Sequence, residues 1–192
     1  MATTNQAGGE LDCKIVYYGP ASSGKTTNLK YVYRKLDPAT RGKLITPSTD
    51  SHRTLFFDFL SVDLGKVRGY KTRFHLYTVP GEVRYNESRR LIVRGVDGIV
   101  FVADSQLDRL EDNVESLANL CENLTETGRD LDSMPCVFQY NKRDLADVMP
   151  VAELEQALNR GGFPSFEAIA VEGEGVFETL KAVSKQVITS LS

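Results

Sequence analysis

The sequence has no long apolar run and only a small excess of charge. No apolar stretch approaches the roughly 20 residues that a helix needs to cross a bilayer, so we expect no membrane-spanning segment. The 192 residues carry a formal net charge of −3. This balance argues against broad electrostatic binding to nucleic acid or to anionic lipid. The length and the ordinary share of apolar residues suit one compact domain.

Cysteine and histidine are scarce as well. The three cysteines, Cys13, Cys121 and Cys136, lie far apart and form no CxxC pair. We therefore expect reduced, mostly packed thiols rather than disulfides or metal ligands. His52 and His75 have no metal-ligand spacing, and we expect neither to be catalytic. The cysteine usage favours the reducing environment of the cytoplasm.

The two ends of the sequence carry no recognised targeting signal. The opening MATTNQAGGE has no basic region followed by an apolar core, so we do not expect a signal peptide. It lacks the Gly at position 2 that myristoylation needs, and the closing VITSLS has no prenylation cysteine, so we expect no lipid anchor. Residues 1–10 are small and polar and are predicted to be a disordered tail. Residues 11–192 then form the single domain.

Apolar strands alternate with helical patterns along the chain. Continuous apolar runs predict buried strands, and apolar positions repeating every three to four residues predict helices. The predicted strands cover 13–18, 54–64, 70–79, 98–105, 135–141 and 166–171, and the predicted helices cover 24–36, 84–95, 107–127, 151–158 and 176–191. The second and third strands follow one another across a glycine turn and form an antiparallel hairpin. The predicted fold class is α/β, a mainly parallel sheet with one antiparallel edge hairpin and helices on both faces.

The stretch GPASSGKT, Gly19–Thr26, fits the phosphate-loop pattern GxxxxGK[ST] in full. It follows a predicted strand and opens a predicted helix, so its backbone N–H groups would form an anion nest at the positive end of that helix. Lys25 is expected to bridge the terminal phosphates as a catalytic residue, and the Thr26 hydroxyl is expected to bind Mg²⁺. The residues expected to contact the phosphates are Gly19, Ala21, Ser22, Ser23, Gly24, Lys25, Thr26 and Thr27.

A second motif, NKRD at Asn141–Asp144, closes another apolar strand. The guanine edge offers two adjacent donors, and the Asp144 carboxylate can accept both at once. Adenine has no such pair and would leave a buried charge unsatisfied. Asn141 can hydrogen-bond the base and tie this loop to the phosphate loop, and the Lys142 stem can lie over the ring. Together the two motifs predict a site for GTP and GDP at the carboxyl edge of the sheet.

Several longer stretches carry a family resemblance. They are CKIVYYGP…GKTTNL, RTLFFDFL, GYKTRFHLYTVPG, GVDGIVFVADSQ, QYNKRDL and GVFETLKAV. Through them the chain resembles the Ras-like small GTPases of the bacterial MglA family, from about Asp12 to Leu191. The resemblance implies the P-loop small-GTPase fold and a switch between GTP and GDP states that controls cell polarity or gliding motility. It also implies a roadblock-fold activator like MglB, downstream effector proteins, and recruitment by partners to a cell pole.

The resemblance also assigns roles around the polar loop at 37–53. Thr54 resembles the switch threonine that completes the Mg²⁺ shell beside the γ-phosphate, and Arg53 resembles a built-in arginine finger. Gly81 resembles the glycine whose N–H senses the γ-phosphate. Ala170 falls where Ras-like proteins contact the base through a backbone N–H.

Three positions bear on whether the chain hydrolyses GTP. Thr78 occupies the place where most nucleotide switches carry an aspartate that helps to hold Mg²⁺. We therefore expect the metal site to lose one outer carboxylate. The stretch TVPG itself nevertheless matches the pattern of the MglA family. Glu82 stands where a water-positioning Gln is expected, and an ionised Glu accepts hydrogen bonds but donates none. Ala21 replaces an expected Gly, and its methyl group could crowd the catalytic groups. We predict slow hydrolysis, with Arg53, Glu82 and Lys25 as the catalytic residues.

The sequence leaves two points open. Asp58 lies on the strand face opposite Leu55, Phe57 and Phe59, which fits a side chain pointing toward the site and equally fits a solvent-facing carboxylate. The function also has alternatives. One is a GTP-bound scaffold that no longer hydrolyses, and the other is a P-loop kinase, which is disfavoured because NKRD already accounts for base choice.

Overall fold

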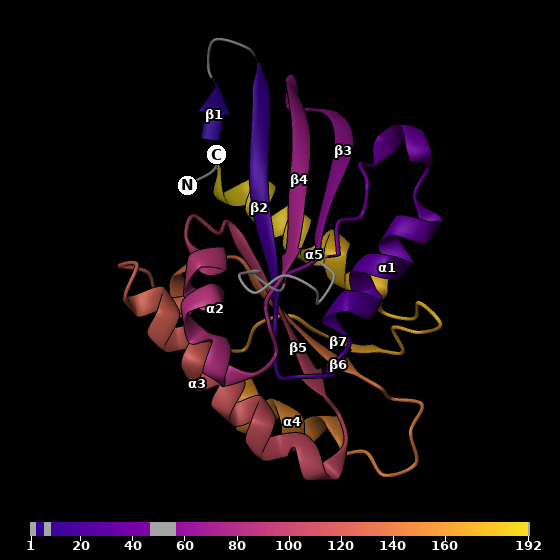
Figure 1. The fold of residues 1–192 in the computed structure, drawn as a ribbon, viewed down its shortest axis with the longest axis vertical. Coiled ribbons are helices and arrows are strands. Elements are labelled where there is room, and N and C mark those ends of the chain that lie inside the picture. Colours follow the sequence, from indigo (N-terminus) through magenta and orange to yellow (C-terminus); the bar gives the residue numbers. More distant parts are fainter. Residues whose placement is uncertain (1–2, 6–8, 47–56, 192) are drawn as a thin grey trace.

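The computed structural model describes residues 3–5, 9–46 and 57–191, which form a seven-stranded sheet covered by helices (Figure 1). The strands are β1 (Thr3–Asn5), β2 (Glu10–Tyr18), β3 (Phe59–Val67), β4 (Tyr70–Thr78), β5 (Gly98–Asp104), β6 (Cys136–Asn141) and β7 (Ser165–Ala168). Their order is β3-β4-β2-β5-β6-β7, with β1 beside β2. β4, β2, β5, β6 and β7 are mutually parallel, whereas β3 is antiparallel to β4. The predicted mainly parallel sheet with an antiparallel hairpin is confirmed.

The first ten residues differ from the predicted disordered tail in two places. Thr3–Asn5 forms β1, which pairs antiparallel with the start of β2, and β2 itself begins at Glu10. This position is free for β1 because β5 pairs with β2 only from Ile15 onward. Part of the predicted tail therefore joins the sheet, while the boundary of the domain at residue 11 stays a prediction.

Five α-helices occur in the described part of the chain. They are α1 (Lys25–Lys35), α2 (Asn86–Val93), α3 (Leu110–Thr125), α4 (Val151–Leu158) and α5 (Val176–Ser190), with short 3-10 turns at Pro38–Thr40, Val83–Tyr85, Leu107–Arg109 and Leu131–Ser133. The apolar residues of α1 and α5 join one core, and those of α2, α3 and α4 join the other. Helices therefore cover both faces of the sheet, as predicted. The helix predicted at 84–95 is shorter, because a 3-10 turn precedes α2.

The side chains of β2 alternate between these two cores. Cys13, Ile15 and Tyr17 pack with α1 and α5, and Val16 and Tyr18 pack with α2, α3 and α4. Because both faces of the strand are buried, its sequence is an almost continuous apolar run. The carboxyl end of β2 is thereby fixed between the helix layers, and this end carries the phosphate loop.

Cys13 and Cys136 are buried and Cys121 is exposed on α3, and all three are free cysteines. Burial, reinforced by the charges of Asp97 and Asp12, raises the pKa of the Cys13 thiol to about 12. No helix among the described residues is long and apolar enough to cross a membrane.

Candidate functional site

The loop between β2 and α1 folds tightly at the carboxyl edge of the sheet. Gly19 and Gly24 have φ angles of 143° and 104°, which favour glycine, and Ser22 has a φ of 62°. A Cβ at Gly19 would lie 2.2 Å from the Val102 carbonyl oxygen, and a Cβ at Gly24 would lie 2.1 Å from Asn141 Nδ2. The close approach of these neighbours therefore requires glycine at both positions.

A cavity of about 530 Å³ lies inside this loop. It is lined by phosphate-loop residues, by the end of β4 with the turn after it, and by the residues before β3. The predicted site residues in its lining are Ala21, Ser22, Gly24, Lys25, Thr26, Thr27, Gly81 and Glu82. The structure thus brings the phosphate loop together with the TVPG turn, which lies more than fifty residues further along the chain.

Lys25 is buried at the start of α1. Its Nζ donates hydrogen bonds to the carbonyl oxygens of Gly19, at 3.0 Å, and Pro20, at 2.5 Å. Burial, together with the positive charge of Arg89, lowers the pKa of Lys25 to about 7, and the nearby Asp58 opposes this shift. The ammonium group is poorly solvated in this arrangement, so an anion in the loop would stabilise its charge.

Asp58, directly before β3, is 5% exposed and lines the cavity. Its Oδ2 accepts hydrogen bonds from Thr26 Oγ1 at 2.5 Å and from Thr78 Oγ1 at 2.9 Å. Its N–H donates to Thr78 Oγ1 at 2.8 Å. Of the two orientations left open by the sequence, the carboxylate takes the one toward the site. A carboxylate therefore lies at this edge although position 78 carries a hydroxyl, and whether it serves a Mg²⁺ ion stays a prediction.

The oxygen donors at this edge fit a hard cation. Hydroxyl and carboxylate oxygens suit Mg²⁺, which keeps several waters when it binds beside phosphates. The described residues contain no group of three or more His, Cys, Asp or Glu side chains that could hold a metal ion by themselves. Phosphate oxygens and waters are the further ligands that Mg²⁺ commonly takes in such sites.

Gly81 lies directly against the phosphate loop. A Cβ at Gly81 would lie 2.3 Å from the Cα of Ala21 and 2.5 Å from its nitrogen, so this contact also requires glycine. The next residue, Glu82, is half-exposed, and its Oε2 pairs with Arg84 Nε at 2.5 Å. The carboxylate at the expected water-positioning place is thus held by an arginine two residues further on.

Asn141, the first residue of NKRD, joins three loops. Its Nδ2 donates to the Ser23 carbonyl oxygen at 2.8 Å, and its Oδ1 accepts the Ala170 N–H at 2.9 Å. The structure therefore contains the predicted tie between NKRD and the phosphate loop. Because the Ala170 N–H already donates to Asn141, its contact with a base stays a prediction. Asp144 is exposed.

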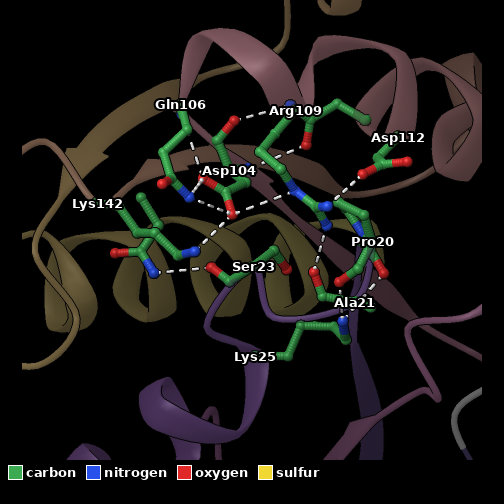
Figure 2. Close-up of polar contacts among 12 residues, drawn as sticks. Pro20, Ala21, Ser23, Lys25, Asp104, Gln106, Arg109, Asp112 and Lys142 are labelled. Atoms are coloured by element: carbon green, nitrogen blue, oxygen red, sulfur yellow. Dashed lines mark hydrogen bonds and ion pairs between the residues drawn. The ribbon is translucent and has the colours of Figure 1, made fainter. Parts of the chain in front are cut away.

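Lys142 enters a charged network that sequence reasoning missed (Figure 2). Its Nζ lies 2.6 Å from Oδ2 of Asp104, the fully buried last residue of β5. Arg109 Nε is 3.8 Å from the same oxygen, and Arg109 Nη2 donates to the Ala21 carbonyl oxygen at 2.9 Å. The network links NKRD to the phosphate loop. The sequence signal for Asp104 was its place at the carboxyl end of an apolar strand.

Two predicted site residues cannot be placed relative to the cavity. Arg53 and Thr54 lie outside the described residues, as does His52, so the arginine finger and the second Mg²⁺ ligand stay predictions. The other histidine, His75, lies on β4, and its Nε2 is 2.9 Å from Asp12 Oδ1 on β2. It does not line the cavity.

Similarity to known proteins extends along the whole chain. Residues 2–187 match Arf, the ADP-ribosylation factor family. The mutual gliding-motility protein MglA of Myxococcus xanthus (strain DK1622) is 58% identical over 191 residues, which cover 100% of this chain and 98% of that protein. ADP-ribosylation factor-like protein 6 of Caenorhabditis elegans is 25% identical over 186 residues, covering 93% of this chain and 88% of that protein. ADP-ribosylation factor-like protein 4A of Homo sapiens is 26% identical over 125 residues, covering 60% and 58% respectively.

Proposed function

The chain belongs to the ADP-ribosylation factor family and is a bacterial MglA-like small GTPase, and from this premise we propose that it binds GTP and GDP with Mg²⁺ and hydrolyses GTP slowly. The observation that supports this proposal most directly is the Asn141 side chain, which bonds both to the phosphate loop and to the loop at Ala170. It holds the base-reading motif beside the anion nest of the phosphate loop, which is the combination a guanine nucleotide needs.

Phosphate binding would change the partners of Lys25. The ammonium now donates to two carbonyl oxygens of its own loop. Terminal phosphate oxygens would replace those carbonyls, and their charge would raise the pKa of Lys25 toward its ordinary value. The loop N–H groups from Ala21 to Thr27 would hold the rest of the phosphate chain, while Asp144 would accept the two guanine donors.

Thr26 and, by resemblance, Thr54 would hold Mg²⁺, which neutralises charge on the β- and γ-phosphates when bound. Asp58 has a defined part in this arrangement. Because the Thr26 hydroxyl donates its hydrogen bond to Asp58, the lone pairs of its oxygen are left for a cation. Thr78 holds the same carboxylate from the opposite side. We propose that the pair Asp58 and Thr78 replaces the single aspartate of other switches.

Slow hydrolysis follows from Glu82 and Ala21. Glu82 can accept a hydrogen bond from an attacking water but cannot donate one to the γ-phosphate. The methyl group of Ala21 adds bulk at the residue that touches Gly81. Arg53 would supply the charge stabilisation of an arginine finger, an effect worth about 10³–10⁵ in rate where it operates.

The cellular role that we propose comes from the relative named for mutual gliding motility. The chain would act from the cytoplasm as a switch in cell polarity or gliding motility. A roadblock-fold activator would accelerate hydrolysis, and effector proteins would bind the GTP state and recruit the switch to a cell pole.

A GTP-bound scaffold is the second candidate, and the Glu82–Arg84 ion pair favours it. If that pair persists with nucleotide bound, no side chain at position 82 orients the water. The two candidates differ in single-turnover GTP hydrolysis by the purified protein, with and without a roadblock-type activator.

We expect slow turnover that the activator accelerates, and faster turnover after Glu82→Gln combined with Ala21→Gly. Absence of GTP hydrolysis in both the wild type and this double variant would favour the scaffold. A preference for ATP over GTP in direct binding would overturn both candidates.

A further inference from the structure

Arg89, on α2, is a fully buried arginine behind the phosphate loop. Its guanidinium carbon lies 4.4 Å from the ring centroid of Tyr18, the last residue of β2, which immediately precedes the loop. Its Nη2 donates to Ser116 Oγ on α3 at 2.7 Å. Ser116 in turn lines a second cavity, of about 380 Å³, that is also bordered by Pro20, Ala21 and Gly81. The guanidinium therefore lies between the β2 end of the loop and the α3 side of the TVPG turn.

Arg89 forms no ion pair with a carboxylate among the described residues, and the nearby Glu115, which is exposed on α3, acts on the guanidinium only through its field. Within the same part of the chain, the Nε and Nη1 of Arg89 have no hydrogen-bond partner. Burying an unpaired cation normally costs several kcal/mol, so proteins rarely keep one without a use for its charge. Arg90, the next residue, has the ordinary arrangement, since it is partly exposed and pairs with Glu126 at 2.8 Å.

The electrostatic effect of Arg89 extends to the phosphate site. Burial first, and then the positive charge of Arg89, lowers the pKa of Lys25. A charge that disfavours a second cation at Lys25 favours an anion at the same place. Because the guanidinium is buried, dissolved salt screens this effect far less than it screens a surface charge.

We propose that Arg89 is a specificity-determining residue that makes the site prefer the triphosphate to the diphosphate. The proposal rests on the proposed function, since it assigns a preference to the same nucleotide site. GTP places an additional negative charge beside Lys25 that GDP lacks. Two unit charges about 10 Å apart in a medium of effective dielectric constant about 20 change an equilibrium on the order of tenfold. Arg89 does not contact the reacting atoms and acts through its field.

The test compares the affinities of two nucleotides in two variants. Dissociation constants for GDP and for the non-hydrolysable analogue GppNHp are measured with excess Mg²⁺ in wild type, Arg89→Gln and Arg90→Gln. Both variants remove one positive charge from adjacent positions of the same helix, so the net charge of the protein changes equally. We expect the preference for GppNHp over GDP to fall about tenfold in Arg89→Gln and to stay at the wild-type value in Arg90→Gln.

Two further variants separate charge from packing. Ser116→Ala removes the hydrogen bond to Arg89 and keeps the charge, and Arg89→Lys also keeps the charge, so both should preserve the wild-type preference. If Arg89→Gln fails to fold, Ser116→Asp takes its place, because a carboxylate at position 116 would pair with the guanidinium and neutralise it. Ser116→Asp should lower the preference for GppNHp over GDP. Ser116→Asn is its uncharged control.

The inference would be overturned if the preference for GppNHp over GDP were unchanged in Arg89→Gln, or in Ser116→Asp where Arg89→Gln does not fold. An equal change of this preference in Arg90→Gln would also overturn it. A wild-type protein that binds neither GDP nor GppNHp would instead overturn the proposed function, so the two failures are distinguishable.

Discussion

The Asp58 carboxylate accepts hydrogen bonds from two threonine hydroxyls, one on the phosphate loop and one at the end of β4. Along a single strand, the hydroxyl of Thr78 indicates the loss of an acidic group. Asp58, directly before β3, and Thr78, the last residue of β4, are neighbours at the end of the hairpin. An acidic function can therefore move to the adjacent strand while the cavity keeps a similar set of oxygen atoms.

Asp58→Asn should weaken Mg²⁺ binding to the nucleotide complex by roughly 10- to 100-fold, as loss of an outer-shell partner commonly does. The measurement is the release rate of fluorescent GDP as a function of Mg²⁺ concentration. Asp63→Asn is the matched control, because Asp63 lies nearby on β3 and its carboxylate accepts the Gly65 N–H in the hairpin turn, away from the cavity. The same Mg²⁺ requirement in Asp58→Asn and wild type would contradict the role given to Asp58.

Cys13 makes a prediction about alkaline pH. Its pKa rises from an ordinary value of 9.0 to about 12 in the folded protein, so the folded state keeps a proton that the unfolded state releases above pH 9. Folding stability therefore falls as pH rises above 9, by at most about 1.4 kcal/mol per pH unit from this thiol. Urea unfolding at pH 8 and pH 10 should show a smaller decrease for Cys13→Ser than for wild type. An identical decrease in both proteins would rule out this contribution.

At the scale of elements, α5 packs closely on β5 at Gly98. A Cβ at this position would lie 2.6 Å from Val187 Cγ2 and 3.0 Å from Val183 Cγ2, both on α5. The glycine therefore sets the distance between helix and sheet. This contact stabilises the α5 side of the molecule without touching the cavity.

Gly98→Ala should lower the free energy of unfolding by about 1–3 kcal/mol, because the added methyl group overpacks the interface. Adding Val187→Ala should recover part of this loss, since it removes the methyl group that is struck. Gly42→Ala is the control, because its Cβ would meet Ser61 Cβ at an ordinary 3.4 Å. Urea denaturation of five proteins gives the comparison, which are wild type, Gly98→Ala, Val187→Ala, the double variant and Gly42→Ala. If Val187→Ala lowers stability as much in the Gly98→Ala protein as in wild type, the steric explanation is wrong.

At the scale of the whole molecule, the proposed ligand should hold together segments that are distant in sequence. Mg²⁺ with GDP at about 100 times its dissociation constant should stabilise the fold by about 2.7 kcal/mol, which corresponds to roughly 5–10 °C in the thermal midpoint. ATP at the same concentration should give no shift. Asn141→Ala should reduce the shift with GDP, because it removes the bonds to Ser23 and Ala170. An equal shift with ATP would contradict the base selectivity given to NKRD.

The sequence predicted the parts of this molecule whose signals are local. The apolar run of β2 and the GKT pattern after it each specify their structure within a few residues, so both were predictable. The roles of Asp58 and Arg89 were not predictable. Asp58 acts with Thr78, and Arg89 packs on Tyr18, and each pair becomes neighbours only when the chain folds. The short β1 pairs on an edge of β2 that stays open until Ile15, and no sequence pattern marks that opening.

The Asn141 side chain has a consequence for the kinetics of binding. Both of its hydrogen bonds join parts of the chain to one another, so neither has to form when a ligand arrives. The conformational entropy of ordering the loops that Asn141 joins is already lost during folding. Guanosine, which has no phosphates, should therefore associate in a single rapid phase. Any slower, second phase seen with GTP would then report events at the phosphate loop.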